Sequence, residues 1–471
     1  MMVSTRRTST DRGHHVENGK RPADPLGSAA AGDVPGAPGR ARSGRPPLDD
    51  EVFFAPYRRH FHPIFGRPSV PIETYLRLMF LKFRYKLGFE PLCREVADSI
   101  SWQRFCRIPL GVAVPHPTTL MKITTRCGTQ AIEELNDALL AKALEARVLK
   151  TNKVRADSTV IEANVAYPTD SGLLAKGVAK MAKTTKKLQA MGFARRTKMA
   201  DRTRSVLSRA RSINANLHRR SDDRLVEVHR INSELVTIAR RVAREADAVV
   251  RNARRKLRRS TSGRARFLVE ELAKTAALTG KIATQTAERM AGGLPAGSSR
   301  IVSLHDSDAR PIKKGRLGKP VEFGYKAQLV DNEDGVILDH NLEVGNPADA
   351  SMLEPAVRRI KARTGQVPRA LTADRGYGEA ELERSLRDLG VRYVVLPTKG
   401  KPNAARRAVE KRRSFQAMVR WRTGCEGRIS CAKRDFGLAR TRLDGIEGAR
   451  TWCGHGVFAH NLVKIAKLMQ T

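Results

Sequence analysis

Residues 321–344, VEFGYKAQLVDNEDGVILDHNLEV, decide the fold. Apolar and polar side chains alternate along 321–329 and again along 336–344, and this period of two predicts two β-strands. Asp334 and Gly335 lie between the two strands and are typical of a tight hairpin turn. The stretch therefore predicts an antiparallel hairpin.

Strands and helices are expected on both sides of this hairpin. Residues 154–161 form a short strand candidate upstream. The downstream elements are a helix ending before Gly365, a strand at 370–373, a helix at 380–389 closed by Gly390, a strand at 391–396 and helices to the end. This order predicts a mixed sheet covered by helices, of the α+β or α/β class, and in a basic protein it points to a ribonuclease H-like architecture.

The charge of the chain indicates a polyanionic partner. Its 471 residues suffice for about three folded units. They include 88 Lys and Arg against 48 Asp and Glu, which gives a formal net charge of +40. Such a surplus favours binding to the many phosphates of a nucleic acid over binding to a small acidic metabolite.

Several classes of protein are excluded by the sequence. The six cysteines show no C-x2-C spacing, which argues against both a zinc ribbon and a dense disulfide scaffold. We find no apolar run of membrane-spanning length and no signal peptide pattern, so we expect a cytoplasmic protein without a membrane partner. The lack of a glycine-rich phosphate loop argues against an ATP-driven machine.

Composition divides the chain into four segments. Residues 1–49 are rich in Gly, Pro, Ser, Ala and Arg and are expected to form a disordered basic tail. Residues 50–149 carry short helical patterns, which suit a helix-turn-helix-like DNA-binding domain or an ordinary helical packing domain. A ribonuclease H-like catalytic domain is expected at 150–174 and 300–471, interrupted by a basic helical insertion at 175–299.

The insertion holds much of the charge surplus. Between Ser171 and Ser260 there are 25 Lys and Arg against 7 Asp and Glu. Apolar residues at three- and four-residue steps predict long amphipathic helices, paired with each other or laid on DNA. A solvated charged face is the alternative. The densest basic run, 251–259, supplies four candidate DNA contacts: Arg254, Arg255, Arg258 and Arg259.

Two aspartates lie where metal-dependent phosphoryl chemistry needs them. Two divalent ions about 4 Å apart must be held by carboxylates that converge from different elements. Asp157 lies within the first strand, where aspartate is a poor strand former. Asp374 follows the strand at 370–373, at the end where open α/β sheets present ligands. The alternatives are a solvated edge-strand aspartate and a turn or helix-capping residue.

A third carboxylate comes from residues 421–433, WRTGCEGRISCAK. Arg422, Glu426 and Lys433 are spaced so that one face of a continuous helix would carry them all. Glu426 would then ligate metal, while the two cations grip phosphates. The alternative is a surface ion pair between Arg422 and Glu426.

Three blocks of this sequence resemble the DDE transposases of bacterial insertion sequences, in the group with an R-x3-E-x6-K signature around the last acid. The blocks are 154–174, 371–377 and 422–433, and similarity also covers 67–147 and 320–346. The resemblance implies a ribonuclease H-like core, Mg²⁺ dependence, and recognition of transposon ends by the N-terminal region. It carries the catalytic and metal-binding roles onto Asp157, Asp374 and Glu426, and phosphate contacts onto Arg422 and Lys433.

Two features depart from the pattern of this group. Val419 occupies the position where the signature usually has a Tyr, so that tyrosine's contact with DNA is missing or is supplied by Trp421. The helical insertion lies between the first and second acids, whereas some relatives place theirs between the second acid and the Glu.

The sequence thus predicts a DNA transposase that cuts at the ends of its element and joins the freed 3′-OH to target DNA. Two Mg²⁺ ions are expected, with Mn²⁺ able to replace them. We expect a homodimer on paired double-stranded DNA ends, in a bacterial, nucleoid-associated setting. The alternatives are a catalytically decayed, transposase-derived DNA-binding protein and a ribonuclease H-like nuclease without strand transfer.

Overall fold

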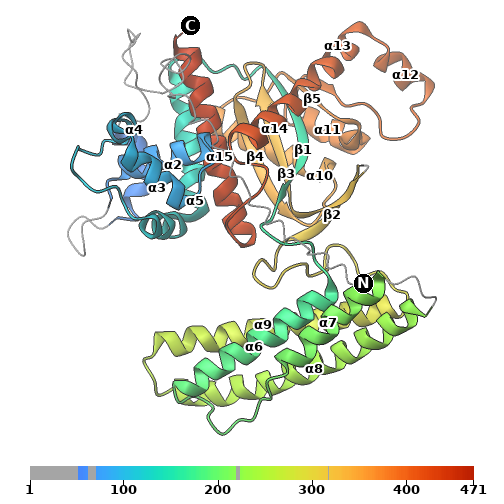
Figure 1. Ribbon diagram of the computed structural model, residues 1–471. Helices are drawn as coiled ribbons and strands as arrows, with labels where there is room; N and C mark the ends of the chain where they lie inside the picture. Colours follow the sequence, from blue (N-terminus) through green and yellow to red (C-terminus); the bar gives the residue numbers. More distant parts are fainter. Residues whose placement is uncertain (1–50, 62–69, 219–222, 317, 471) are drawn as a thin grey trace, which may run out of the picture.

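The computed structural model describes residues 51–61, 70–218, 223–316 and 318–470. The tail predicted at 1–49 lies outside these described residues. Buried apolar side chains form two cores, one shared by the sheet and the N-terminal helices and one inside a helical bundle. Figure 1 shows this bundle as a distinct body below the rest of the molecule. None of the helices in the described ranges is long and apolar enough to cross a membrane.

The sheet is organised around one long strand, β3 (Lys319–Asn332). Its antiparallel neighbours are β1 (Lys153–Glu162), β2 (Arg310–Arg316) and β4 (Ile337–Val344). The β3–β4 pair confirms the predicted hairpin, and Gly335 has a φ of 79° in its turn. This positive φ is one that glycine adopts without strain.

Two short parallel strands extend the sheet beyond β1. β5 (Ala370–Ala373) pairs in parallel with β1, and β6 (Tyr393–Val395) pairs in parallel with β5. The described strands therefore follow the order β2-β3-β1-β5-β6, with β4 also paired to β3. The prediction of a mixed sheet is confirmed.

The sequence pattern missed β2. Its residues, RPIKKGR, include one proline and four cations. They show no regular alternation of apolar side chains. β2 lies at the edge of the sheet, where lysines and prolines are common because they discourage pairing with a further strand.

Helices cover the sheet after the hairpin. α10 (Ala350–Thr364) ends at Gly365, which has a φ of 70° and confirms the predicted stop. α11 (Ala380–Asp388), α12 (Ala404–Glu410), α13 (Arg413–Arg422) and α14 (Gly424–Asp435) follow, and α15 (Gly445–Gln470) ends the chain. In Figure 1, α12 and α13 project from the sheet on the side opposite to α2–α5.

The N-terminal helices pack against α15 and share its core. They are the short η2 (Glu51–Phe54) and α1 (Ala55–Arg58), then α2 (Ile72–Arg84), α3 (Phe89–Asp98), α4 (Ile100–Phe105) and α5 (Pro117–Glu145). The Asn136 side chain of α5 donates to the carbonyl of Gly454 in α15 across 3.1 Å. α5 is capped by His116, whose side chain accepts from the Thr118 amide. Residues 106–116 separate α4 from α5, which is longer than the turn of three or four residues in a standard helix-turn-helix.

The bundle consists of four long helices between β1 and β2. They are α6 (Asp170–Ala190), α7 (Thr203–Leu217), α8 (Arg224–Leu257) and α9 (Gly263–Met290). Their apolar faces, including Leu235, Val242 and Leu272, point into a common core, as expected of amphipathic helices that pair with each other.

We predict that Gly324→Ala destabilises the sheet. A Cβ at Gly324 would lie 2.2 Å from the carbonyl oxygen of Ile161 and 2.8 Å from the amide of Ala163, so the β1–β3 pair must shift. The free energy of unfolding should fall by about 1–3 kcal/mol, the usual cost of overpacking. Urea unfolding followed by tryptophan fluorescence measures this, because Trp102, Trp421 and Trp452 all lie outside the bundle.

Gly427→Ala is the matched control. A Cβ there meets nothing within 4 Å, and the position is helical, so alanine should stabilise by about 0.5–1 kcal/mol. Equal effects of the two substitutions would contradict the steric explanation.

Candidate active site

The strand register brings Asp157 and Asp374 together. β1 and β5 are parallel, and Ala156 of β1 lies opposite Ala373 of β5. Asp157 follows Ala156 on β1, and Asp374 follows Ala373 at the end of β5. The two aspartates are therefore neighbours, because paired strands lie about 5 Å apart. Asp374 then caps the short 3₁₀ helix η3 (Arg375–Tyr377) by accepting from the Gly376 amide across 2.8 Å.

Asp157 is buried and short of compensating charge. Its side chain is 12% exposed. The pKa of this carboxyl is raised to about 6, chiefly by burial; Asp374 and Glu426 also raise it, while the Ser158 amide and Arg422 lower it. A carboxylate under such repulsion is a suitable ligand for a cation.

The third acid reaches the site from the junction between α13 and α14. The prediction of one continuous helix through 421–433 is wrong, because the helix is interrupted at Thr423. Arg422 nevertheless links two of the acids: its guanidinium lies 2.9 Å from Glu426 Oε1 and 3.4 Å from Asp157 Oδ2. The surface ion pair named as the alternative for Arg422 and Glu426 is therefore present, and it extends to Asp157. Glu426 itself is 63% exposed.

A buried ion pair on the sheet holds this junction in place. Arg155 donates to both carboxylate oxygens of Asp331, each across 2.9 Å, and the two residues are opposite each other on β1 and β3. Arg155 also donates to the carbonyl oxygen of Trp421 across 2.7 Å. Arg428 of α14 lies 3.4 Å from the same aspartate. Both sides of the α13–α14 junction are thus fixed to the sheet.

The sequence analysis missed a fourth carboxylate beside Asp374. Asp349, just before α10, pairs with Lys326 Nζ at 2.8 Å. A Cβ on Gly376 would lie 3.0 Å from Asp374 Oδ1 and 3.1 Å from Asp349 Oδ2, so the two carboxylates flank that glycine. Burial and then Asp349 raise the pKa of Asp374, while Arg422 and Lys326 lower it. Only the position of Asp349 before a helix could have drawn attention to it, and that position equally suits a capping residue.

The donor chemistry of this site fits a divalent ion of the Mg²⁺ type. Carboxylate oxygens are the ligands that hard cations prefer, and a cation would relieve the repulsion that raises the pKa values of Asp157 and Asp374. Within the described ranges, no group of three or more His, Cys, Asp or Glu is arranged closely enough to hold a metal. Arg422 pairs with both Asp157 and Glu426.

Other residues predicted for the site lie farther away. Lys433 is on α14, seven residues after Glu426, which is roughly 10 Å along a helix axis. The Trp421 ring packs under the cations of Lys153 and Arg155, at 5.1 and 4.7 Å, so it lies against the sheet. Val419 is half-buried in α13.

The four arginines predicted to contact DNA lie on the bundle, at the end of α8. Arg254 is paired with Glu270 at 3.0 Å. The other three line a hollow of the surface together with Lys256: Arg255, Arg258 and Arg259. They belong to the body that Figure 1 shows below the sheet.

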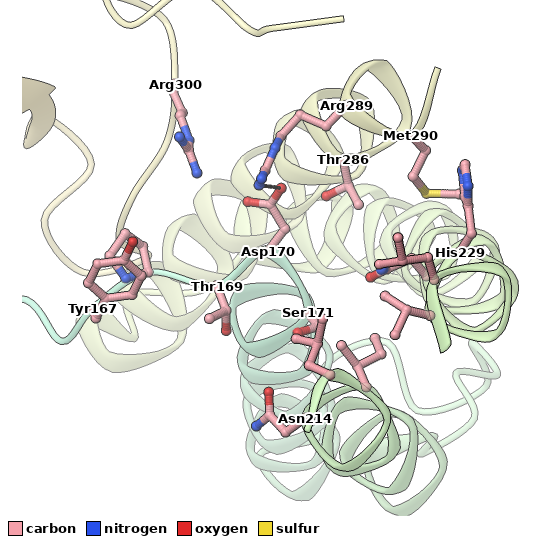
Figure 2. Close-up of a pocket in the computed structure, with 16 residues that line it drawn as sticks. Tyr167, Thr169, Asp170, Ser171, Asn214, His229, Thr286, Arg289, Met290 and Arg300 are labelled. Carbon is pink, nitrogen blue, oxygen red and sulfur yellow. Dashed lines mark hydrogen bonds and ion pairs between the residues drawn. The ribbon is translucent and has the colours of Figure 1, made fainter. Parts of the chain in front are cut away.

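The bundle also has a cavity of about 570 Å³ at the end where α6 begins. Figure 2 shows the Asp170 and Arg289 side chains meeting at its wall, 2.8 Å apart. None of the residues predicted for catalysis lines this cavity. It is therefore separate from the acidic site.

We predict that Arg155→Met lowers the free energy of unfolding by about 3–5 kcal/mol. Asp331 is fully buried, and removing its partner leaves a charge without adequate compensation in the core. The double variant Arg155→Met/Asp331→Leu should be more stable than Arg155→Met alone, because it removes the orphaned charge. Urea unfolding of the unmodified protein, of Arg155→Met, of Asp331→Leu and of the double variant measures this, and strictly additive losses would contradict the ion-pair explanation.

We also predict that Asp157→Asn stabilises the metal-free protein at high pH. The folded state raises the pKa of Asp157 from 3.8 to about 6, so ionisation opposes folding above pH 6 and has no effect well below 3.8. Asparagine should therefore add up to about 3 kcal/mol to the free energy of unfolding at pH 8 and far less at pH 4. Unfolding in the presence of a chelator at both values measures the difference.

Asp435→Asn is the control for this pH dependence. Its pairing with Arg434 lowers the pKa of Asp435, so asparagine there should give a small loss at pH 8 instead of a gain. If Asp157→Asn increased the free energy of unfolding equally at pH 4 and pH 8, the raised pKa assigned to Asp157 would be refuted.

Comparison with known proteins identifies two family domains in the chain. Residues 297–462 match the family described as "Transposase DDE domain", and residues 41–126 match "Transposase domain (DUF772)". Asp374 and Glu426 lie inside the first range, whereas Asp157 lies outside both.

One relative is similar to part of the chain. An uncharacterised protein of Rhizobium meliloti, ORF8 in the nfe locus, is 31% identical over 143 residues, which are 29% of this chain and 67% of that protein. No solved structure matches the chain. Together with the observed mixed sheet and its paired aspartates, the two domains show that the chain belongs to the DDE transposases, which are typical of bacterial insertion sequences.

Proposed function

We propose that this transposase cleaves DNA at the ends of its element in a Mg²⁺-dependent reaction and transfers the resulting 3′-OH to target DNA. The observation that carries the proposal is the electrostatic coupling of Asp157 to both Asp374 and Glu426, three acids from different elements, together with the ion pairs of Arg422 to Asp157 and Glu426. Convergent carboxylates of this kind are the requirement for two-metal phosphoryl transfer.

Each acid has a distinct position in this proposal. Asp157 and Asp374 are set by paired strands, and Glu426 is exposed at the start of α14. These three would hold the divalent ions, which supply charge neutralisation at the phosphate and an acidified water when bound. Asp349 is held by Lys326, and its carboxylate and that of Asp374 both lie beside Gly376.

Arg422 has two successive roles in the proposal. Without DNA it neutralises Asp157 and Glu426. With DNA bound, its guanidinium is placed to donate to the oxygens of the scissile phosphate, for which its planar donor pattern is suited. Lys433 would contact a phosphate farther along α14.

Recognition of the DNA is proposed for the helices at 50–149, and further backbone contact for the insertion at 175–299. The four arginines at the end of α8 carry the second part of this proposal, although Arg254 is already paired with Glu270. A homodimer on paired ends would place one catalytic domain, 150–174 with 300–471, on each end.

Two rival functions make different demands on the structure. A decayed DNA-binding derivative would not require the acids, yet all three are present, and Asp157 lies near enough to Asp374 and Glu426 for their charges to raise its pKa. A nuclease on the same core would cut DNA but would not join paired 3′-OH ends to a target. Supplying such ends together with target DNA therefore separates transfer from cleavage alone.

We predict that Asp157→Asn, Asp374→Asn and Glu426→Gln each reduce Mg²⁺-dependent cleavage at least about a hundredfold, because a lost ligand removes several kcal/mol of transition-state stabilisation. The substrate is a plasmid carrying the DNA that flanks the reading frame on both sides. DNA binding should persist, since none of the three residues lies on the N-terminal helices. Asp388→Asn, at the end of α11, is the control and should cleave normally. Substantial cleavage by Asp374→Asn would refute the assignment.

A further inference from the structure

A second basic surface lies next to the acids, on the part of the chain from 398 to 422. This segment contains α12 and α13, and we call it the α12–α13 lobe. It holds nine Lys and Arg against a single acidic residue, Glu410. Figure 1 shows the lobe projecting from the sheet, away from both the bundle and the N-terminal helices.

Both ends of the lobe are fixed close to the acids. Arg375, which directly follows Asp374, donates to the carbonyls of Thr398 and Gly400 across 2.8 and 2.7 Å. At the other end, α13 finishes at Arg422, which pairs with Asp157 and Glu426. The position of the lobe relative to the acids is therefore set by direct contacts.

Few of the lobe's cations are needed to hold it together. Arg406 pairs with Glu383 of α11 and with Glu410, and its guanidinium lies 5.7 Å from the centre of the Phe415 ring. Phe415 is the one buried residue of α12 and α13. Arg406 and Phe415 thus account for much of the internal packing of the lobe.

The remaining cations of the lobe face solvent without acidic partners. Among the described residues, the ion pairs of this segment are those of Lys399, Arg406 and Arg422. Six others are exposed and form none: Lys401, Arg407, Lys411, Arg412, Arg413 and Arg420. Arg254 on the bundle, by contrast, is already neutralised by Glu270. Unneutralised charge of one sign repels itself, and a polyanion relieves this repulsion.

We infer that the α12–α13 lobe binds the phosphate backbone of duplex DNA directly beside the phosphate held at the acids. α13 has 10 residues, so it extends about 15 Å from the acids. With base pairs about 3.4 Å apart, this length corresponds to roughly four base pairs. The inference rests on the proposed function and adds to it a DNA-binding surface within the catalytic domain.

The test uses the full-length protein and a 30-bp duplex of random sequence. Four lobe cations are replaced by Gln together: Lys411, Arg412, Arg413 and Arg420. The logarithm of affinity is measured against the logarithm of salt concentration, whose slope changes by about 0.9 for each phosphate contact. We expect the slope to flatten by up to roughly 3–4 units, with an unchanged Tm because these side chains are exposed.

The matched control removes the same charge from another part of the catalytic domain. Four exposed cations without ion pairs in the structure are replaced by Gln: Lys361, Arg369, Arg384 and Arg392. Arg369 and Arg392 precede β5 and β6, at the opposite end of these strands from Asp374. This control should change the slope by less than about one unit, because long-range attraction is screened by salt. A lobe variant with Lys in place of the three arginines should keep the original slope.

The outcomes separate the lobe from the proposed function. An unchanged slope in the lobe variant, or an equal change in lobe and control variants, overturns the inference while leaving the proposed function intact. Failure of the unmodified protein to bind or cleave any DNA overturns the proposed function itself. A flattened slope in the lobe variant alone supports the inference.

Discussion

The geometry of the candidate active site depends on the buried ion pair between Arg155 and Asp331. Removing two charges from water costs several kcal/mol for each ion, and the cost is offset only when the pair is well aligned and its other donors and acceptors are used. Here Arg155 donates to both carboxylate oxygens of Asp331 and also to the Trp421 carbonyl. A second cation, Arg428, lies 3.4 Å from the Asp331 carboxylate. The same atoms that satisfy the pair therefore fasten β1, β3, α13 and α14 to one another.

The position of Arg155 on β1 determines where the α13–α14 junction lies relative to Asp157. Arg155 is two residues before Asp157, so both side chains point to the same face of the sheet. Arg155, which fixes the α13–α14 junction, is therefore the neighbour of Asp157 on that face of β1. Gly424 is part of this arrangement, because a Cβ there would lie 2.2 Å from the Arg155 guanidinium. The close approach leaves Arg422 and Glu426 over the exposed side of Asp157.

Local sequence patterns could predict the strands and two of the acids, but not their supporting contacts. The alternation in 321–344 gave the hairpin, and Asp374 was found because it follows a short apolar strand. The ion pair joins residues 176 positions apart, and no local period encodes such a contact. The same limit explains why neither the place of Asp349 beside Asp374 nor the end of α13 at Arg422 can be predicted from local sequence.

The topology explains how a long basic insertion can interrupt the catalytic sheet without disturbing the acids. The chain leaves the sheet after Glu162 and returns at Arg310, and both residues lie opposite Gly324 of β3. The two ends of the insertion are therefore about two strand spacings apart, roughly 10 Å. A bundle with its own core spans this gap without strain, and the entropy of closing a long loop grows only slowly with its length. Because the bundle has a core of its own, we expect substitutions on its surface to leave the β1–β5 pairing, and with it the register of Asp157 and Asp374, unchanged.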